Sequence, residues 1–461
     1  MKIKILITVI MSACILNIQA QSGVDHSFSL NEAREFSITN NPIIKNARLT
    51  VSASNEQKKQ AIAQGLPQAD ISMDYINYFN YELEFSFGGG GEVPSLDYSK
   101  FDLGDLEVLK LLQGFLEPSE PSKIVMDHSA SAKFQINQLV FSGQYFVGVQ
   151  TSKIAYRLSQ QALEKTEKDI KELVSFAYFL VLMTEESMKI IDNNILNLKE
   201  TLNKSEAMLR AGIIEQTDVD QIKMALSMLK NTKNSMNRSL ELNYNSLRFQ
   251  LGLKRDDKIE LTDNFNDLIT QTDLNSLLLS PFTYENNVDY QLIKSQEELS
   301  EKMINFEKAA YLPTLVGFYS YNEKILTTDF DMNPKHLAGL SLSLPIFSSG
   351  LRNSKLNIAK IELEKTKINK DMVIDQLLLQ EKQYRYNLNN SIDNYFLQKE
   401  NMALAKNVYS SMERKYNQGI LSSLDLTQAN DNYLKAHNTY LSSVFEVLQS
   451  KLALNKLLNN I

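Results

Sequence analysis

The sequence predicts a mainly α-helical protein with a small β part, built from two copies of one structural unit. Two long runs are almost free of helix breakers: Gln144–Arg210 has no proline and one glycine, and Leu351–Gln418 has neither. At 1.5 Å per residue, each run forms a helix of about 100 Å. Corresponding motifs recur in both halves of the chain, which indicates an internal duplication. Alternating segments before each long run supply the β part.

The composition excludes several classes of protein. The 461 residues are 43% hydrophobic and 22% charged, with a formal net charge of −7, so no basic surface for nucleic acid is expected. The four histidines are far apart in sequence and lack the spacing of metal ligands. No glycine-rich phosphate loop, nucleophile elbow or zinc-protease motif occurs. The sequence therefore predicts no enzyme, with no catalytic residue, metal or cofactor.

Residues 1–20 are predicted to be a signal peptide. A short basic region precedes the apolar run Ile5–Ile18, and small and polar residues follow, so cleavage is expected after Ala20. The alternative is a lipobox in which Cys14 carries the lipid. Cleavage after Ala20 leaves a mature chain without cysteine. No later apolar stretch reaches the ~18 residues of a transmembrane helix.

Matching motifs set the boundaries of the two repeats. Pro67 and Pro313 each mark the point where a helix gives way to a strand. The offset between the copies is about forty residues larger at the prolines than at later motifs, so the first copy has an insertion between its strands. The first repeat is expected over 21–252, with strands at about 69–83 and 128–140, an acidic loop at about 84–127 and a helical hairpin over 144–251. The second is expected over 286–461, with strands at about 314–323 and 336–345 and a hairpin over 351–460, after a connector at 253–285.

The predicted strands alternate apolar and polar residues. Ile71, Met73 and Tyr75 alternate with Ser72 and Asp74, for example. Alternation fits any half-buried sheet, and it also fits a membrane barrel whose apolar face meets lipid. The signal peptide and the aromatic-rich strands favour the barrel. Single-chain barrels need about eight strands and lipid cannot satisfy an open sheet edge. Four strands per chain therefore require strands from other chains. Two copies would give eight strands, in a barrel whose interior is filled by side chains, and three would give twelve, the larger number that a conduit needs.

Two similar motifs, QLVFSGQ and LPIFSSGLR, mark the corners where a strand passes into a long helix. Gly143 and Gly350 lie at or beside these turns, where glycine permits backbone angles that other residues resist. Phe141 and Phe347 are expected near the membrane interface, where aromatic residues gather.

Each long helix is expected to end at a glycine in the left-handed conformation, Gly212 or Gly419. Asp218 and Asp425 follow at equivalent positions, where a carboxylate stabilises the start of a helix. Two pairs have the spacing of capping boxes that begin the return helices: Thr217 with Asp220, and Ser422 with Asp425.

In this order and spacing, the motifs resemble the TolC-like outer membrane factor family. They comprise the opening FSLNEAREFSITNNPIIKNARL (Phe28–Leu49), the two proline junctions, the two corners, and the segments Arg210–Leu226 and Asn417–Leu434. The resemblance covers residues 28–458. It implies a homotrimer in the bacterial outer membrane, with a twelve-stranded β-barrel and a long periplasmic α-barrel of antiparallel coiled-coil helices. The connector is expected at the equator of that α-barrel.

The implied function is the exit duct of a tripartite efflux or type I secretion system. The duct conducts substrates passively and docks on a periplasmic membrane fusion protein and an inner-membrane pump. Drug efflux and protein secretion both remain open, as do the substrate and the pump class. The main alternative is a periplasmic coiled-coil scaffold or adaptor that never enters a membrane, which leaves the four alternating strands unexplained.

The resemblance also implies that residues of the helical turns close the periplasmic entrance. Tyr416, Asp425 and Asp218 occupy the matching positions. The family's best-known gate has an arginine where this chain has Leu421, so the means of closure is open. Three Asp425 carboxylates around one axis are expected to favour cations. The acidic loop is expected to be extracellular, with a lid over the mouth as the alternative.

Overall fold

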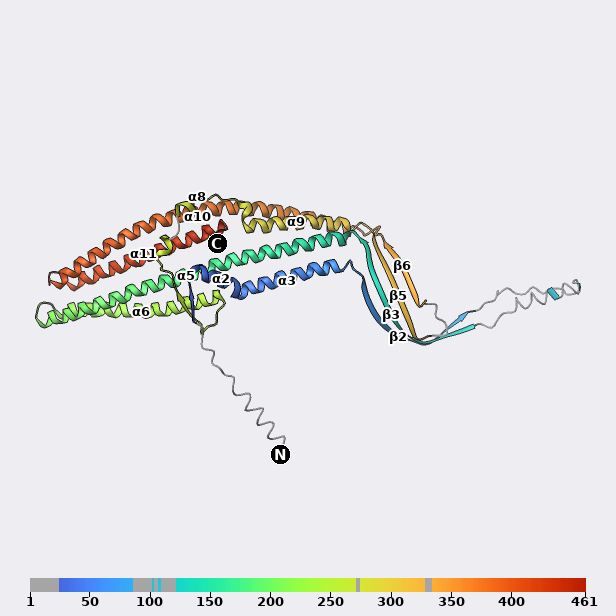
Figure 1. The fold of residues 1–461 in the computed structure, drawn as a ribbon, viewed down its shortest axis with the longest axis horizontal. Helices are drawn as coiled ribbons and strands as arrows, with labels where there is room; N and C mark the ends of the chain where they lie inside the picture. Colours follow the sequence, from blue (N-terminus) through green and yellow to red (C-terminus); the bar gives the residue numbers. More distant parts are fainter. Residues whose placement is uncertain (1–24, 86–101, 103–106, 109–121, 271–273, 328–333) are drawn as a thin grey trace, which may run out of the picture. The chain divides into compact units, whose positions relative to one another are not determined.

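The computed structural model describes residues 25–85, 102, 107–108, 122–270, 274–327 and 334–461 (Figure 1). The predicted signal peptide, Cys14 and most of the expected acidic loop lie outside these residues. The chain divides into two compact units. In the described part, none of the helices has both the length and the apolar character needed to cross a membrane. Unit 1 comprises Met1–Glu56, Lys153–Glu301 and Lys360–Ile461, and unit 2 comprises Gln57–Ser152 and Lys302–Ala359.

The predicted mainly helical fold class is confirmed. Both breaker-poor runs are single helices, of 68 residues in α5 and 67 in α10. Each is followed by a return helix after a short turn (Figure 1). The hairpins are α5 (Gly143–Arg210) with α6 (Gln216–Leu251), and α10 (Leu351–Asn417) with α11 (Ser423–Leu457). The shorter helices are α2 (Leu30–Asn40), α3 (Pro42–Ala63), α7 (Asp267–Thr270), α8 (Leu274–Leu279), η2 (Tyr284–Asn286) and α9 (Val288–Ala309).

Unit 2 contains a four-stranded antiparallel sheet in the order β2-β3-β5-β6. The first two strands are longer than expected, because residues 81–85 pair with 122–126 beyond a register shift between Asn77 and Tyr81. Phe79 and Asn80, within this shift, have φ values of 54° and 57°. Strands β2 and β6 form the two edges, and each pairs with one neighbour. The strands are β2 (Gln68–Phe85), β3 (Ser122–Ser142), β5 (Thr314–Leu326) and β6 (His336–Ser343).

Unit 1 contains a second, parallel sheet that the sequence analysis does not predict. Its strands are β1 (Asp25–Phe28) and β4 (Lys258–Leu261), which pair residue for residue. Strand β4 belongs to the expected connector, so this segment is docked on the N-terminal strand. Four residues are too few to show an alternating pattern, and the partners are far apart in sequence.

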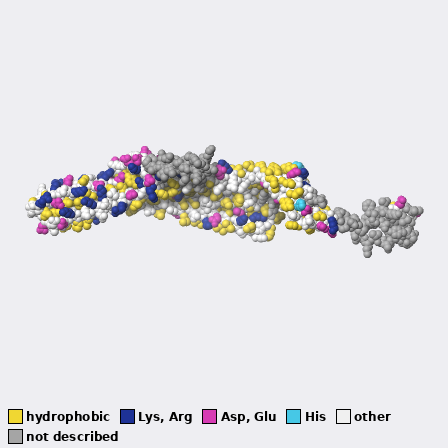
Figure 2. All heavy atoms as spheres, turned by 90° about the horizontal axis from the view of Figure 1, so that it is seen from below, with side chains coloured by type: hydrophobic (Ala, Val, Ile, Leu, Met, Phe, Trp, Pro, Cys, Tyr) yellow, Lys and Arg dark blue, Asp and Glu magenta, His cyan; other side chains and the backbone are white. Residues whose placement is uncertain are grey.

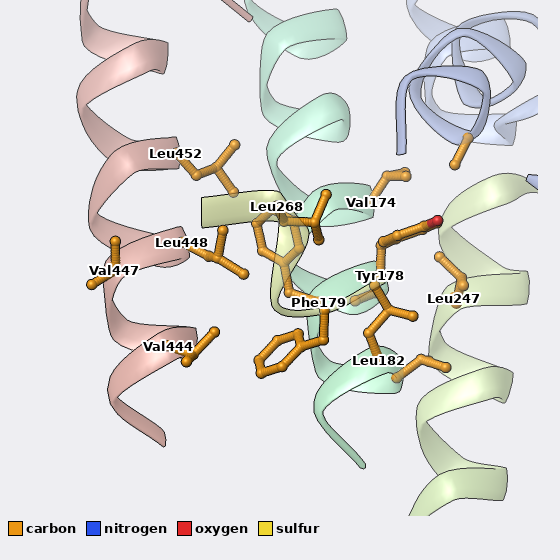
Figure 3. Close-up of a cluster of buried hydrophobic side chains, with 14 of the residues drawn as sticks. Val174, Tyr178, Phe179, Leu182, Leu247, Leu268, Val444, Val447, Leu448 and Leu452 are labelled. Atoms are coloured by element: carbon orange, nitrogen blue, oxygen red, sulfur yellow. The ribbon is translucent and has the colours of Figure 1, made fainter. Parts of the chain in front are cut away.

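Tyr178 of α5 lies in the hydrophobic core of unit 1 (Figure 3). Its ring is fully buried and belongs to a hydrophobic cluster that includes aliphatic side chains of α5, α6 and α11. Its hydroxyl lies 2.9 Å from Oδ2 of Asp263 and 3.0 Å from the carbonyl oxygen of Phe28. The same Asp263 oxygen accepts the N–H of Leu30 at 2.7 Å. One buried tyrosine therefore joins the end of β1, the start of α2 and the segment after β4.

The corner between α2 and α3 packs against the end of α6. The backbone of Gly252 has a left-handed φ of 74°. A Cβ atom there would lie 2.6 Å from the carbonyl oxygen of Asn40. Next to it, Nδ2 of Asn41 donates to the carbonyl of Gln250 at 2.6 Å. Glycine is needed here for both its backbone angle and its small size.

Two glycine substitutions should separate these requirements. Gly252→Ala is expected to destabilise the protein by at least about 3 kcal/mol, because it adds a backbone clash to left-handed strain. Gly212→Ala is the matched control: its φ is 73°, but no atom lies within 4 Å of the added Cβ. That control should cost about 1 kcal/mol. Thermal unfolding midpoints of the purified variants measure the difference, and equal midpoints would contradict the close-packing argument.

Candidate functional site

Residues 211–215 and 418–422, here called the paired turns, have the same backbone structure. Gly212 and Gly419 have left-handed φ values of 73° and 72°, as the sequence predicts. In the first turn Gly212 N–H donates to Leu209 at 2.9 Å, and Ile213 N–H donates to Met208 at 3.0 Å. The second turn repeats these bonds at 2.9 and 3.1 Å. This is the Schellman motif, which satisfies the carbonyl groups at a helix end.

The return helices begin differently. Ser422 is the N-cap of α11, and its Oγ accepts the N–H of Asp425 at 3.2 Å, as predicted. The predicted capping by Thr217 is wrong: Glu215 is the N-cap of α6, and Thr217 is already helical. Asp218 Oδ2 accepts the N–H of Glu215 at 3.2 Å. The spacing between the repeats aligns Glu215 with Ser422, so a comparison of the two copies could have predicted Glu215 as the N-cap.

Asp218 and Ser423 join the two hairpins of the chain. Ser423 is fully buried, and its hydroxyl lies 2.6 Å from Asp218 Oδ1 and 2.7 Å from Gln221 Oε1. The hydrogen bond from Ser423 lowers the pKa of Asp218 below its ordinary value. Sequence reasoning selected Asp218 but missed Ser423, whose type alone does not distinguish it from the neighbouring Ser422.

Tyr416 also connects the hairpins. It is 1% exposed, and its hydroxyl lies 2.7 Å from Oγ of the buried Ser205 on α5. Burial raises the pKa of Tyr416. Leu421 is partly buried against the same cluster, whereas Asp425 is exposed and accepts a hydrogen bond from Ser422 Oγ at 2.6 Å. Of the predicted gate residues, Tyr416 and Asp218 thus contact the other hairpin and Asp425 faces outward.

A ladder of aromatic rings follows α10 and α11 away from the paired turns. The centroid distances are 5.8 Å for Tyr409–Tyr433, 6.1 Å for Tyr433–His437 and 6.0 Å for His437–Tyr440. His437 is 8% exposed, and its Nδ1 has no hydrogen-bond partner among the described residues. Burial lowers the pKa of His437, and this effect outweighs the nearby Glu186.

His437 should make the helical unit sensitive to acid. Unfolded histidine titrates near pH 6.5, whereas the folded form has a lower pKa. The unfolded state therefore binds the proton first, and stability should fall below about pH 6.5, by at most about 1.4 kcal/mol per pH unit. Unfolding measured from pH 8 to pH 5 should show a shallower decline for His437→Phe. A decline in His437→Phe as steep as in the wild type would contradict this role of His437.

The two strand-to-helix corners differ. Gly350 has a φ of 82° after Ser349 at 47°, which fits the expected left-handed turn. Gly143 does not: it is the first residue of α5, directly after β3. A Cβ atom there would lie 2.6 Å from Leu312 Cδ1, so a larger residue would require the Leu312 side chain to move. Phe141 is 39% exposed and Phe347 is 85% exposed.

Both helix-to-strand junctions have the same local structure. Pro67 and Pro313 directly precede β2 and β5. Leu66 N–H donates to Ala63 at 3.0 Å, and the equivalent bond before Pro313 measures 3.1 Å. Since proline cannot donate a hydrogen bond, it stops the helix at the same point in both copies.

Charged and apolar side chains are distributed unevenly. On the face shown in Figure 2, charged side chains are frequent over the hairpin ends of unit 1, and apolar side chains gather over unit 2. No group of three or more His, Cys, Asp or Glu residues in the described part is placed to hold a metal ion.

Residues 283–460 match the family described as outer membrane efflux protein. The chain resembles that family, as its motifs predict. The match lies in the second repeat, and the family description agrees with the predicted outer membrane location and transport class. A search of curated proteins gave no match.

Solved structures of outer membrane channels have the same fold over nearly the whole chain. CusC is 14% identical, with a TM-score of 0.72 and coverage of 93% of this chain and 92% of the other. The CmeC channel of Campylobacter jejuni is 15% identical, with a TM-score of 0.68 and coverage of 94% and 85%. VceC of Vibrio cholerae is 14% identical, with a TM-score of 0.67 and coverage of 93% and 95%. Both repeats therefore share the fold of such channels.

Proposed function

We propose that this protein is the outer membrane exit duct of a tripartite efflux or type I secretion system, and that it works as a homotrimer. The family match supports the transport class and the location. The observation that carries the assembly is the sheet of unit 2, which leaves two edges open. Substrates would pass through the duct without chemical change, so no catalytic residue is assigned.

The order and direction of the strands support closure of the sheet with strands of other copies. Neighbouring strands are antiparallel throughout, so the edge strands β2 and β6 run in opposite directions. The β6 edge of one copy can therefore pair in antiparallel fashion with β2 of the next. Both faces of β2 and β6 are exposed, and alternate residues are apolar, including Met73 (77%) and Leu340 (72%). Lipid would cover the apolar face, and closure would satisfy the edge backbone groups.

A lysine placed on either face of β2 should test this assembly. Met73→Lys places a charge on the proposed lipid face, at a cost of about 2–4 kcal/mol at mid-membrane depth. It should reduce the amount of heat-modifiable trimer in the outer membrane fraction. Ser72→Lys, the adjacent position on the opposite face, is the control and should assemble normally. Recovery of wild-type protein outside the membrane fraction, without heat-modifiable bands, would favour the periplasmic scaffold instead.

The paired turns are proposed as the periplasmic end of the duct, where the fusion protein and pump would dock. Ile213 and Ile420 are equivalent residues of the two turns and are 62% and 70% exposed. Equivalent apolar side chains at both turns would suit a partner that binds the two hairpin ends in the same way. Closure would depend on two hydrogen bonds within the chain, between Tyr416 and Ser205 and between Ser423 and Asp218, and on the exposed Asp425.

Weakening these ties should open the duct. Replacing both Tyr416 and Asp425 with Ala removes a buried hydrogen bond and the outward carboxylate. The open fraction should rise about ten-fold, since the lost bond is worth about 1.4 kcal/mol. Conductance in planar bilayers measures this change. Tyr409→Ala removes a tyrosine of similar burial on the same helix, about two turns away, and should leave conductance near the wild-type value. Unchanged conductance in the double variant would refute the gating role.

A further inference from the structure

Unit 1 contains a cavity of about 320 Å³ where the start of α2 meets α5, α11 and the segment after β4. Two cationic side chains line it: Arg34 from α2 and Lys451 from α11. Both are half-buried. We call this space the Arg34–Lys451 cavity. The transport role described above makes no use of it.

The charges of these two side chains are not balanced by ion pairs. Nε of Arg34 donates to the hydroxyl of Ser175 at 2.7 Å, and Nζ of Lys451 donates to the carbonyl of Leu268 at 3.2 Å. Both acceptors are neutral, and among the described residues neither cation lies in a salt bridge. Burial lowers the pKa of both groups, and the charge of Arg34 lowers that of Lys451 further.

Two other cations of the same unit have carboxylate partners. Lys456, on the same helix as Lys451, binds Glu172 at 2.6 Å and also pairs with Asp169. Lys171 of α5 binds Glu35 at 3.0 Å. A partly buried charge without an ionic partner is costly. The fold therefore keeps two such charges together at one cavity.

The acids near the cavity do not neutralise both charges. Asp263 lines the cavity, but its Oδ2 already accepts the N–H of Leu30 and lies beside the hydroxyl of Tyr178. Glu32 is directed to the backbone N–H and hydroxyl of Ser29, each at 2.8 Å. One engaged carboxylate facing two cations leaves a surplus of positive charge.

We propose that the Arg34–Lys451 cavity binds a small tetrahedral oxyanion, phosphate or sulfate. A guanidinium group matches two oxygens of such an ion, and an ammonium group binds another as a point charge. The volume suits a free ion with its remaining water better than a lipid with acyl chains. A bound anion would link α2, near the N-terminus of the described chain, to the C-terminal helix α11, and would stabilise the folded state.

Thermal unfolding of the purified full-length protein tests this site. Phosphate or sulfate is exchanged for chloride at constant ionic strength, and the midpoint is followed against anion concentration. The wild-type midpoint should rise and saturate. Lys451→Met should weaken the apparent affinity at least about ten-fold, because one charged hydrogen bond is lost. Lys451→Arg should retain the response.

The direction in which Lys451→Met shifts the unfolding temperature provides a second readout. Without phosphate or sulfate, the variant should unfold at the wild-type temperature or above it, since a repulsive, desolvated charge is gone. In saturating phosphate it should unfold below wild type. Arg34→Met should behave likewise. Arg48→Met is the control: Arg48 lies in an exposed pair with Glu167 at 3.2 Å, and its loss should leave the phosphate response intact.

Three results would overturn the proposal. The first is a wild-type midpoint that does not respond to either anion, as expected if a carboxylate of a neighbouring chain fills the cavity. The second is an equal response in Lys451→Met and wild type. The third is stabilisation by a water-soluble short-chain phosphatidylglycerol without any by phosphate, which would assign the cavity to a lipid headgroup.

Discussion

Every buried backbone N–H and C=O group needs a hydrogen-bond partner, and this requirement constrains both the helices and the sheet. The two longest helices satisfy their groups internally over 68 and 67 residues, and the Schellman turns at Gly212 and Gly419 satisfy the carbonyl groups at their ends. In the described part of the chain, the edge strands β2 and β6 of the unit 2 sheet each pair with one neighbour. The helical hairpins therefore satisfy their backbone within the chain, whereas the proposed trimer would supply partners for the sheet edges.

The hairpin ends are joined by side chains in place of backbone bonds. Ser205, Ser423 and Asp218 supply short polar contacts between the two hairpins, next to the apolar cluster around Tyr416. Ser205 and Ser423 are fully buried, so leaving one of their hydroxyl groups without a partner would cost about 1–3 kcal/mol. The core around Tyr178 likewise combines full burial with hydrogen bonds to separate segments. In both places buried hydrogen bonds fix which segments of unit 1 lie together.

The polar groups of unit 1 differ in how completely they are neutralised. Lys456 and Lys171 have carboxylate partners, whereas Arg34 and Lys451 share one cavity without an ion pair in the described chain. His437 is similar in kind, a titratable ring buried among tyrosines with an unpartnered Nδ1. Such unpaired, partly buried groups lower the stability of unit 1. They mark the places where solution conditions act on its stability.

The sequence by itself determined the architecture. Glycine and proline placement defined both hairpins, strand alternation located the sheet, and the duplication placed equivalent residues in both copies. These signals are local or periodic, so they can be recognised in the sequence without knowing which residues are in contact. The sequence does not show, however, that Leu312 closely approaches Gly143.

Only the tertiary structure decided which residues meet across long separations. The pairing of β1 with β4, the burial of Tyr416 against Ser205 and the convergence of Arg34 with Lys451 have no periodic signature. Each depends on how segments far apart in the chain are aligned. Packing determines that alignment, and the spacing of residues in the sequence does not reveal it. The predicted gate candidates were chosen by their position in the turns, whereas the contacts of Tyr416 and Asp218 follow from how one hairpin lies against the other.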